Sequence, residues 1–524
     1  MNKICLINPP YIGKQNLDSQ KHKYYQTGYT IPHLGLGYIA SVLEDNRYDV
    51  DLFECMGQRI DVDEIIDIIN SNNYSMIGIS VYDNNLKNAY RIIKGINKIN
   101  HPFIFIGGYC ATFNYDQILL SLPQIDCCVI GEGEITTLEL ANAINCGNSW
   151  KSTKGIAYNS VQGIIKTDKC EIIENLDELP IPKRAFFSNS GMATISSSRG
   201  CANNCCYCAV SNFYNLCSNK KIRFRSAKSI IEEINYLINT YPNIKEITFL
   251  DENILLRSNS NIARLSEFIQ IMKKNDLFIP FRITACAKDI VSSFSMLKNL
   301  KEVGLRHVFV GIESFIQRQL DYYRKNTTVL ENIKAIEILS DLSLTADIAL
   351  IPYDQNSTLS EINEFYNTLS ITSYLSLATS YSDYHSRINI MIACNGTPIK
   401  DNLIKANEYI NNEYGYRFKN ESIYLLHKIL RNWHVHIDSI AEKMYLIDFC
   451  LEIGRIEDYN KLMNIKRKII HLDVEYVKFI TNLLIDGIQV DKIYSIYSDS
   501  WFKRLLSYKN EFLSVEMMVD NYEI

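Results

Sequence analysis

Short apolar runs alternate with amphipathic helical patterns along the first 145 residues of the chain. The β-rich runs are Lys3–Ile7, Val50–Glu54, Met76–Ser80, Phe103–Ile106 and Cys127–Ile130. The helical patterns are Leu36–Glu44, Val62–Asn70, Leu86–Ile96, Asp116–Leu122 and Thr136–Ile144. Apolar strands separated by one helix each are typical of βα crossovers, which build a parallel sheet covered on both faces. This pattern predicts a doubly wound, Rossmann or flavodoxin-like α/β domain over residues 1–150.

A second stretch repeats this alternation with longer helices. Its expected strands are Thr194–Ser197, Glu246–Leu250, Phe281–Ala285, His307–Gly311, Ala346–Leu350 and Tyr374–Ala378. Helices are expected to begin near Ser226, Ser260, Val291, Ile316 and Leu359, with another at Val329–Ser340. Six βα units predict a (β/α)6 partial TIM barrel over residues 186–395, with its site at the carboxyl ends of the strands.

The remaining segments differ from both stretches. Residues 151–185 are interpreted as an irregular hairpin, with strands at Gly155–Asn159 and Ile164–Thr167, and an extended linker rich in proline. Residues 396–524 lose the β-rich runs, and their patterns predict a mostly helical region, for example at Ile423–Trp433 and Ser439–Leu451.

Composition narrows the class of protein. Hydrophobic residues make up 47% and charged residues 22% of the chain, which is ordinary for a globular protein. The 54 basic and 59 acidic residues are mixed along the sequence, so no nucleic-acid partner is expected. No apolar run is long enough to span a bilayer, and Met1–Asn8 leads directly into a strand pattern rather than a signal peptide. We therefore expect a cytoplasmic protein with no membrane partner.

Fifteen cysteines fall into two groups. Four lie within eight residues, at 201, 205, 206 and 208. The others are interpreted mostly as small buried side chains of a reducing compartment. These are Cys5, Cys55, Cys110, Cys127, Cys128, Cys146, Cys170, Cys217, Cys286, Cys394 and Cys450.

The four clustered cysteines follow the first expected barrel strand. The spacing Cys201-x3-Cys205-x2-Cys208 places three thiolates on one short loop, and Cys206 is a spectator by its spacing. A structural zinc ion or a ferredoxin-type cluster normally takes four protein ligands. Three cysteines on a 4Fe–4S cubane would leave one iron open for a small molecule. Zinc, an electron-transfer cluster and unligated cysteines are the alternatives to this interpretation.

Loops after the first-domain strands are candidate ligand sites. One is Ser80–Asn85, and two others carry paired glycines, the run Gly107-Gly108-Tyr109-Cys110-Ala111-Thr112 and the run Gly131-Glu132-Gly133-Glu134. Ligands of doubly wound folds lie beyond the carboxyl ends of the strands, and glycines let the backbone approach a flat ligand closely. The alternative is a set of tight turns in which Glu132 and Glu134 favour a helix N-terminus.

The cysteine loop, with Tyr207 before its last cysteine, resembles that of the radical S-adenosylmethionine (SAM) superfamily. The runs IPHLGLGYIASVLE, IGISVYDNN, IFIGGYCAT, CVIGEGEITTLEL and LDELPIP resemble its cobalamin-binding subgroup across residues 1–185. The runs RFRSAKSIIEEI, ITFLDENILL and HVFVGIES continue the resemblance to residue 350. The chain lacks the Asp-x-His-x-x-Gly motif that ligates cobalt, so His33 is not expected to be a cobalt ligand.

The resemblance implies three cofactors: a 4Fe–4S cluster, SAM and cobalamin. Its implied cluster ligands are Cys201, Cys205 and Cys208, whose open iron chelates the amino and carboxylate groups of SAM. Tyr207 is expected near the adenine, and Asp251 and Glu252 near the SAM amino group. Candidates for the SAM carboxylate and ribose are Arg282, Thr284, Glu313 and Ser314. Candidates for cobalamin contacts are Ser80, Gly107, Gly108, Thr112, Gly131, Glu132 and Gly133.

The function implied by the resemblance is a cobalamin-dependent C-methyltransferase acting on an unactivated carbon of a peptide or small natural product. In the superfamily, reduction of the cluster cleaves SAM to a 5′-deoxyadenosyl radical, which requires an electron donor such as flavodoxin or ferredoxin. A cyclase or rearrangement enzyme with the same cofactors is one alternative. A non-catalytic cobalamin or metal sensor is the other.

Overall fold

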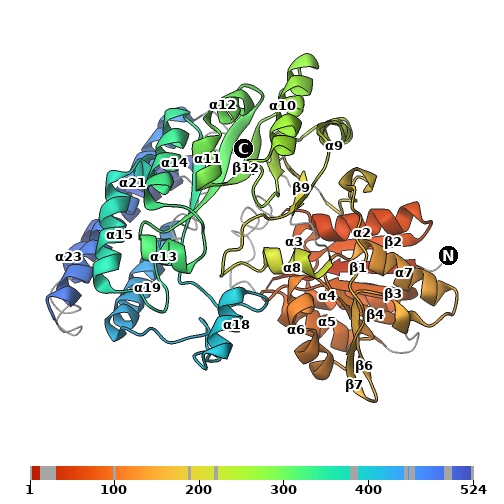
Figure 1. Ribbon diagram of the computed structural model, residues 1–524. Coiled ribbons are helices and arrows are strands. Elements are labelled where there is room, and N and C mark those ends of the chain that lie inside the picture. The colour runs from red at the N-terminus through yellow and green to blue at the C-terminus, as the bar shows by residue number, and fades with distance from the viewer. Residues whose placement is uncertain are drawn as a thin grey trace.

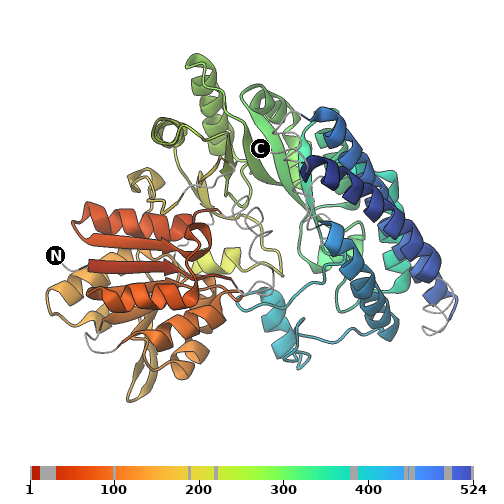
Figure 2. The ribbon, with the colours of Figure 1, turned by 180° about the vertical axis from the view of Figure 1, so that it is seen from behind.

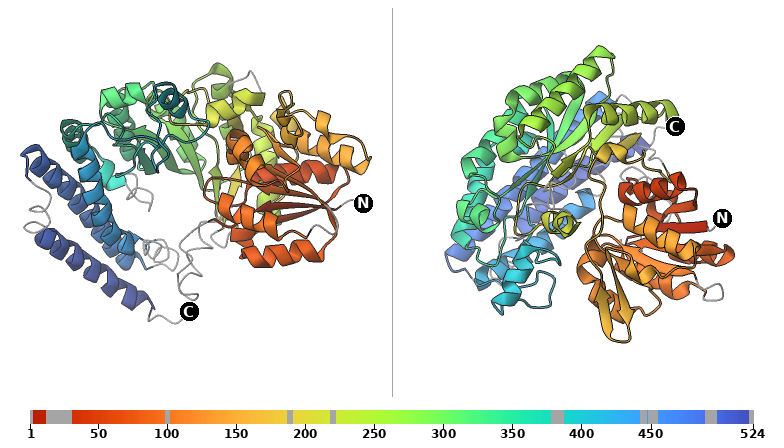
Figure 3. Two further views of the ribbon diagram at one scale, coloured as in Figure 1. Left: turned by 90° about the horizontal axis from the view of Figure 1, so that it is seen from below. Right: turned by 45° about the vertical axis from the view of Figure 1, so that its right-hand side comes forward.

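The structure is a computed structural model that describes residues 3–11, 31–97, 102–186, 191–217, 222–377, 387–441, 447, 455–488 and 498–520. An N-terminal α/β domain lies beside a second α/β domain, here called the barrel domain (Figures 1 and 2). Two C-terminal helices, α21 (Ile456–Ile485) and α23 (Ser498–Asp520), lie on the far side of the barrel domain from the N-terminal domain (Figure 3). A shorter one, α18 (Pro398–Lys405), lies beside α6 (Tyr109–Ser121) of the N-terminal domain (Figure 1). This arrangement confirms the predicted fold class.

The N-terminal domain is doubly wound. Its parallel strands are β1 (Lys3–Asn8), β2 (Asp49–Glu54), β3 (Tyr74–Ser80), β4 (Phe103–Gly107) and β5 (Cys127–Val129), in the order β2-β1-β3-β4-β5. Its helices are α2 (Leu34–Asp45), α3 (Cys55–Gln58), α4 (Val62–Ser71), α5 (Leu86–Gly95), α6 (Tyr109–Ser121) and α7 (Glu134–Asn145). Separate apolar cores lie on the two faces of the sheet, as continuous apolar strands require.

The predicted hairpin extends this sheet. Strand β6 (Ile156–Ser160) pairs antiparallel with β5, and β7 (Gly163–Lys166) pairs with β6, which gives seven strands in total. Short 3-10 turns at Trp150–Ser152 and Leu176–Glu178 flank the hairpin and begin the linker. Helix α6 begins earlier than the sequence predicts, at Tyr109, directly after Gly108.

The barrel domain is built on five parallel strands among the described residues. They are β8 (Met192–Ile195), β11 (Glu246–Phe249), β12 (Phe281–Cys286), β13 (Leu305–Glu313) and β14 (Thr345–Leu350), in the order β14-β13-β12-β11-β8. The helices that follow are α9 (Ala227–Thr240), α10 (Asn259–Lys274), α11 (Ala287–Ser292), α12 (Phe294–Glu302), α13 (Gln317–Tyr322), α14 (Val329–Asp341) and α15 (Leu359–Ile371). A ribbon of β9 (Ser198–Gly200) and β10 (Ile222–Phe224), with α8 (Val210–Cys217) between its strands in sequence, stands apart from this sheet.

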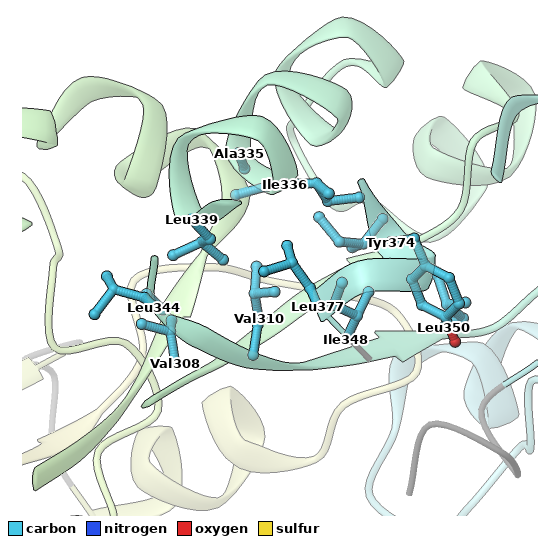
Figure 4. Close-up of a cluster of buried hydrophobic side chains, with 14 of the residues drawn as sticks. Val308, Val310, Ala335, Ile336, Leu339, Leu344, Ile348, Leu350, Tyr374 and Leu377 are labelled. Carbon is cyan, nitrogen blue, oxygen red and sulfur yellow. The ribbon is translucent and has the colours of Figure 1, made fainter. Parts of the chain in front are cut away.

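The sixth strand predicted at Tyr374–Ala378 is wrong. Residues Tyr374–Leu377 form a helical turn, α16, and Ala378 lies outside the described residues. Tyr374 and Leu377 pack beside the β14 side chains Ile348 and Leu350 (Figure 4). A helical turn places residues i and i+3 on one side, whereas a strand would turn one of them away from this core. The apolar composition of the segment therefore reflects burial rather than strand pairing.

The C-terminal region is helical, as predicted. It contains α18 (Pro398–Lys405), α19 (Glu421–Ala441), α21 (Ile456–Ile485) and α23 (Ser498–Asp520). The predicted helix at Ile423–Trp433 lies within α19, but most of the one predicted at Ser439–Leu451 falls outside the described residues. Among the described residues, no helix combines the length and apolarity required to cross a membrane.

The scattered cysteines follow the prediction only in part. Cys5, Cys55, Cys110, Cys127 and Cys128 are buried, free thiols. Cys170 and Cys217 instead form a disulfide that joins the linker to the end of α8, so they are not simple hydrophobic side chains. Cys146 and Cys394 are exposed, Cys286 is half-buried, and Cys450 lies outside the described residues.

Candidate active site between the two domains

A cavity of about 240 Å³ lies between the N-terminal domain and the barrel domain. The N-terminal wall consists of α2 and the loops that follow β3, β4 and β5, and it includes Ser80, Gly107, Gly108, Gly131, Glu132 and Gly133. The barrel wall consists of Ser196, Arg199, Phe213, Tyr214 and Leu250. The loops predicted to bind a flat cofactor therefore meet the segments that flank the cysteine loop.

Three glycines of the N-terminal wall differ in whether they could accept a side chain. Gly108 has φ +99°, and a Cβ there would lie 3.0 Å from the Val81 carbonyl oxygen. A Cβ on Gly131, with φ +82°, would lie 2.1 Å from the sulfur of Cys217. At Gly107 the backbone is relaxed, and an added Cβ would meet only Val129, at 3.7 Å. Gly108 and Gly131 therefore have no room for a side chain, whereas the backbone at Gly107, which lines the cavity, can accept one.

Thr112 and Ser80, two polar candidates for cobalamin contacts, have different surroundings. Thr112 is buried and is not part of the cavity wall; its hydroxyl accepts a hydrogen bond from the Gly131 amide at 3.1 Å and so holds the glycine loop. Ser80 lines the cavity, and its hydroxyl lies 3.0 Å from His33 Nε2. Thr112 is therefore a support for the loop, whereas Ser80 faces the cavity.

His33 is committed to internal hydrogen bonds. Its Nδ1 accepts from the Leu36 amide at 3.0 Å and caps α2, while Nε2 lies 3.0 Å from both Ser80 Oγ and Tyr82 Oη. Burial lowers the pKa of His33 to about 4, so the ring is neutral and Nε2 carries the proton. Neither nitrogen then has a lone pair free for a metal, which agrees with the absence of a cobalt-ligating motif.

Aromatic rings connect the two walls of the cavity. Tyr109, at the start of α6, stacks on Tyr82 with the ring centroids 6.5 Å apart and on Phe213 of α8 at 4.3 Å. Tyr214 follows on α8, and the burial of Tyr109 and Tyr214 raises the pKa of both phenols, so they stay neutral. These rings give no distinct signal in the sequence, because aromatic residues, tyrosine above all, are frequent throughout this chain.

The cysteine loop lies between the ribbon strand β9 and α8. Cys201 and Cys208 are half-buried, and burial raises the pKa of each thiol to about 11. Iron binding must displace these protons. Cys205 is buried, and a negative charge on its thiolate would raise the pKa of both Cys201 and Cys208. Among the described residues, no three His, Cys, Asp or Glu side chains surround a position for a single metal ion.

The fourth cysteine of the loop is enclosed. The Cys206 thiol donates to the Tyr322 carbonyl oxygen at 3.2 Å, and its amide donates to the Tyr323 carbonyl at 2.9 Å. A different thiol, Cys286 at the end of β12, contacts the cysteine loop instead, since Asn203 Nδ2 donates to its sulfur at 3.1 Å. Sequence spacing alone gave no signal for this second contact.

Tyr207 and Glu313 meet at a buried lysine. Lys325 Nζ lies 2.8 Å from Glu313 Oε1 and 3.3 Å from Tyr207 Oη. Burial opposes the lysine charge, but Glu313 outweighs it and raises the pKa of Lys325. Glu313 also has φ +64°, a conformation that side chains rarely adopt. Tyr207 and Glu313 are thus brought together behind the cysteine loop, and Lys325 is a polar partner that the sequence analysis did not single out.

The adjacent carboxylates after β11 have opposite environments. Asp251 is 2% exposed and accepts hydrogen bonds from the Ser197 amide at 3.1 Å, from Ser197 Oγ at 2.8 Å and from Ser198 Oγ. Glu252 is exposed, but displacement of water by the surrounding protein and the charge of Asp251 raise its pKa to about 7. Asp251 therefore fixes the chain, and Glu252 has the carboxylate that is available to a ligand.

The remaining candidates, like Tyr207, Glu252 and Glu313, do not line the cavity. Arg282, near the start of β12, donates to Glu246 Oε2 at 2.7 Å at the end of the sheet opposite the cysteine loop, and Thr284 is half-buried farther along the strand. Ser314 is fully buried, and its hydroxyl donates to Gln319 and accepts from the Ile316 amide at 2.9 Å. The structure does not bring these side chains to the cavity wall.

Comparison with known proteins matches both halves of this site. Residues 26–141 match the B12 binding domain family, and residues 195–369 match the radical SAM superfamily. An uncharacterized methyltransferase, PH0819, of Pyrococcus horikoshii is 30% identical over 352 residues, which cover 66% of this chain and 72% of that protein. The chain belongs to the cobalamin-binding radical SAM enzymes. Its cofactors are a 4Fe–4S cluster, SAM and cobalamin.

The chain is also similar to a named cyclase in sequence and to a solved cobalamin-dependent enzyme in structure. An anaerobic magnesium-protoporphyrin IX monomethyl ester cyclase of Rubrivivax gelatinosus is 27% identical over 349 residues, covering 64% of this chain and 61% of that relative. The solved structure of the cobalamin-dependent SAM radical enzyme OxsB, with aqua-cobalamin and SAM bound, has a TM-score of 0.72 at 18% identity. It covers 99% of this chain and 80% of OxsB, so the whole fold, including the C-terminal helices, has a counterpart. As a radical SAM enzyme, the protein acts on a substrate and requires a reductant.

Proposed function

We propose that this radical SAM enzyme is a C-methyltransferase that acts on an unactivated carbon of a peptide or small natural product. One observation carries the proposal: a single cavity is bounded by the glycine loops of the B12-binding domain and by the segments that flank the cysteine loop. A methyl donor and a hydrogen acceptor must both reach one substrate carbon, and a shared cavity satisfies this requirement.

Each wall has a role in the proposal. Cys201, Cys205 and Cys208 hold the cluster, and Glu252 accepts a hydrogen bond from the SAM amino group. The backbone of Gly107, Gly108, Gly131 and Gly133 supports the cobalamin ring, with no histidine on cobalt. When bound, the cofactors supply SAM cleavage and methyl transfer, and the protein holds them in register and keeps water out.

Two relatives favour different reactions. PH0819 is named a methyltransferase, whereas the Rubrivivax gelatinosus relative is named a cyclase. A cyclisation or rearrangement with the same cofactors is therefore the second candidate. The two reactions consume SAM differently, which allows a direct test.

The test measures products after reduction of the reconstituted enzyme with candidate substrates. In methylation, one SAM gives its methyl group and leaves S-adenosylhomocysteine. A second SAM accepts one electron and is cleaved to methionine and a deoxyadenosyl group, which takes a hydrogen atom from the substrate and is released as 5′-deoxyadenosine. The reductant would supply a second electron in each turnover so that the methyl carrier can accept the next methyl group. A trideuterated SAM methyl group should appear in the product. If 5′-deoxyadenosine forms without S-adenosylhomocysteine and the product carries no label, the enzyme is in the rearrangement class.

A further inference from the structure

Four charged side chains cross the boundary between the two domains beside the cavity. Glu132 and Glu134 come from the loop between β5 and α7, and Arg199 and Arg223 come from the β9–β10 ribbon. Arg199 Nη2 donates to Glu134 Oε1 at 2.6 Å, and its Nη1 lies 3.3 Å from Glu132 Oε2. Arg223 pairs with the other oxygen of Glu132. All four side chains are at most 10% exposed.

The geometry of the ribbon explains why the carboxylates are needed. Arg199 and Arg223 are directly opposed across the antiparallel pair, so they share one face and repel each other. Glu132 and Glu134 balance these two charges, and the Arg199 guanidinium also lies 5.0 Å over the Tyr38 ring. Neither domain can bury its own pair of charges at low cost without the other domain.

On the N-terminal side, the network holds the loop proposed to support cobalamin. Glu132 lies between Gly131 and Gly133, and all three line the cavity. The Gly131 amide is fixed by Thr112, and the Glu132 amide donates to the sulfur of Cys217 at 3.4 Å. A movement of the Glu132 carboxylate would therefore move the cavity wall itself.

On the barrel side, the network holds both SAM-facing elements. Arg199 lies two residues before Cys201 on a three-residue strand, so its position sets where the cysteine loop starts. The preceding residues Ser197 and Ser198 are bound to Asp251, which adjoins Glu252. The same short segment thus connects the N-terminal loop to the cysteine loop and to Glu252.

We propose that Glu132, Glu134, Arg199 and Arg223 form an interdomain clamp that sets the separation and orientation of cobalamin relative to the cluster and SAM. Arg199 is the positioning residue of this clamp, because its planar guanidinium pairs with both carboxylates at once. The inference rests on the cofactor placement given in the proposed function, and its turnover readout rests on methyl transfer as well. Misplacement on the order of 1 Å costs about 100-fold in a reaction that depends on geometry.

The experiment compares Glu134→Gln and Arg199→Lys with a matched control in the reconstituted holoenzyme. Glu233→Gln is the control, because Glu233 is also bound by two arginines, Arg184 at 2.6 Å and Arg225, and is equally buried. Glu233 itself does not line the cavity, but its partner Arg225 reaches the Ser196 carbonyl oxygen at 3.1 Å, so this control also tests whether the loss of any buried ion pair near the cavity changes the readout. Iron and cobalamin contents are measured first and should stay within about twofold of wild type in all three variants, because no ligand is removed.

The deciding readout is the magnetic coupling between cobalt(II) and the reduced cluster, measured by electron paramagnetic resonance without substrate or SAM. Glu134→Gln should change and broaden this coupling, Arg199→Lys should change it less because it keeps one charge contact, and Glu233→Gln should leave it unchanged. In turnover, Glu134→Gln should make 5′-deoxyadenosine at a near-normal rate while methylated product per 5′-deoxyadenosine falls by up to about 100-fold.

Wild-type coupling in both clamp variants would overturn the inference, as would an equal change in Glu233→Gln. A failure of the proposed methyl transfer has a different signature. In that case no variant, nor the wild type, gives labelled product, while the spin coupling still reports whether the clamp sets the distance.

Discussion

The barrel domain contacts its two neighbours through interfaces of opposite chemistry. Toward the B12-binding domain, the contacts are glycine loops, stacked aromatic rings and four paired charges around a cavity. Toward the C-terminal helices, α21 packs on α15 through Ile, Leu and aromatic side chains that share one core with the barrel. Its central charged group is the fully buried pair of Arg387 and Asp473, 2.7 Å apart.

The difference separates two tasks. An interface that admits ligands must keep space and polar groups, and it gives up the apolar burial that would close it. An interface that only stabilises the fold can bury apolar surface, and each Å² of apolar surface removed from water contributes about 25 cal/mol to stability. We therefore expect changes at the first interface to affect the cofactors and changes at the second to affect stability. Five predictions test this division.

The largest effect is expected in the cysteine loop. Cys205→Ala should abolish the cluster, because a cubane with two protein thiolates is not retained. Its neighbour Cys206→Ala is a close control, since both side chains are buried, at 9% and 1% exposure, but the Cys206 thiol is bonded to the Tyr322 carbonyl. Iron and sulfide analysis after anaerobic reconstitution gives the result. Equal iron loss in both variants would contradict the assignment of ligands.

At the second interface, Asp473→Asn should destabilise the C-terminal helices by about 3–5 kcal/mol without changing either cofactor. Burial alone would raise the pKa of Asp473, but His434 and Arg387 outweigh it and hold the pKa well below its usual range. The variant leaves the Arg387 charge buried without its partner carboxylate. Urea unfolding followed by tryptophan fluorescence measures the loss, because Trp433 and Trp501 lie in these helices.

The matched control is Glu511→Gln, which breaks the exposed 3.3 Å pair with Lys468 between α21 and α23. An exposed pair contributes at most about 1 kcal/mol. If Asp473→Asn lost cobalamin or iron while remaining folded, the division between the two interfaces would be wrong.

These interfaces also mark how much the sequence could predict. Strand positions followed from apolar runs because the burial of a parallel sheet on both faces is a local, repeating property of the sequence. The exception, Tyr374–Leu377, is equally apolar but packs on the sheet as a helical turn, and composition does not distinguish the two for so short a segment. The cysteine loop was recognised because its ligands are local in sequence.

Contacts between distant residues were not predictable in the same way. Glu134 and Arg199 are 65 positions apart, and Glu313 meets Lys325 only because the chain turns back after β13. Glu132 was expected at cobalamin, yet its carboxylate is paired with arginines, and only the fold reveals them. The Cys170–Cys217 disulfide has the same origin, since no spacing rule connects the linker to α8.

The third prediction concerns a side chain introduced into the cavity at the first interface. Gly107→Leu should weaken cobalamin binding by up to about 100-fold, which corresponds to the 1–3 kcal/mol cost of overpacking. Gly107 is preferable to Gly108 because its backbone does not require glycine, so the variant should fold normally. Gly107→Ala should have a smaller effect, and titration of the variants with cobalamin, followed by absorbance, measures both. If the wild type, Gly107→Ala and Gly107→Leu bound cobalamin with equal affinity, cobalamin would not lie against this loop.

The fourth prediction concerns pH. The pKa of Glu252 is raised to about 7, so its carboxylate forms as the pH rises through neutrality. SAM binding should therefore tighten by about tenfold between pH 6 and pH 8 at most, since protonation removes the charge that attracts the SAM amino group. Glu252→Gln should bind SAM weakly with no such slope. Glu246→Gln, at the opposite end of the same strand, should keep the slope in equilibrium dialysis.

The fifth prediction, with the smallest expected effect, tests whether His33 at the first interface stabilises the fold without binding cobalt. His33→Ala should leave the cobalt absorption spectrum unchanged, because both ring nitrogens are used by Leu36, Ser80 and Tyr82 rather than by a metal. The variant should lose about 1 kcal/mol of stability through the missing cap of α2. Thermal unfolding measures that loss, and the spectrum of the bound cobalamin is recorded in the same samples. A shift of the cobalt band would show that His33 leaves its cap to ligate cobalt, and the first interface would then contribute a metal ligand in addition to its shape.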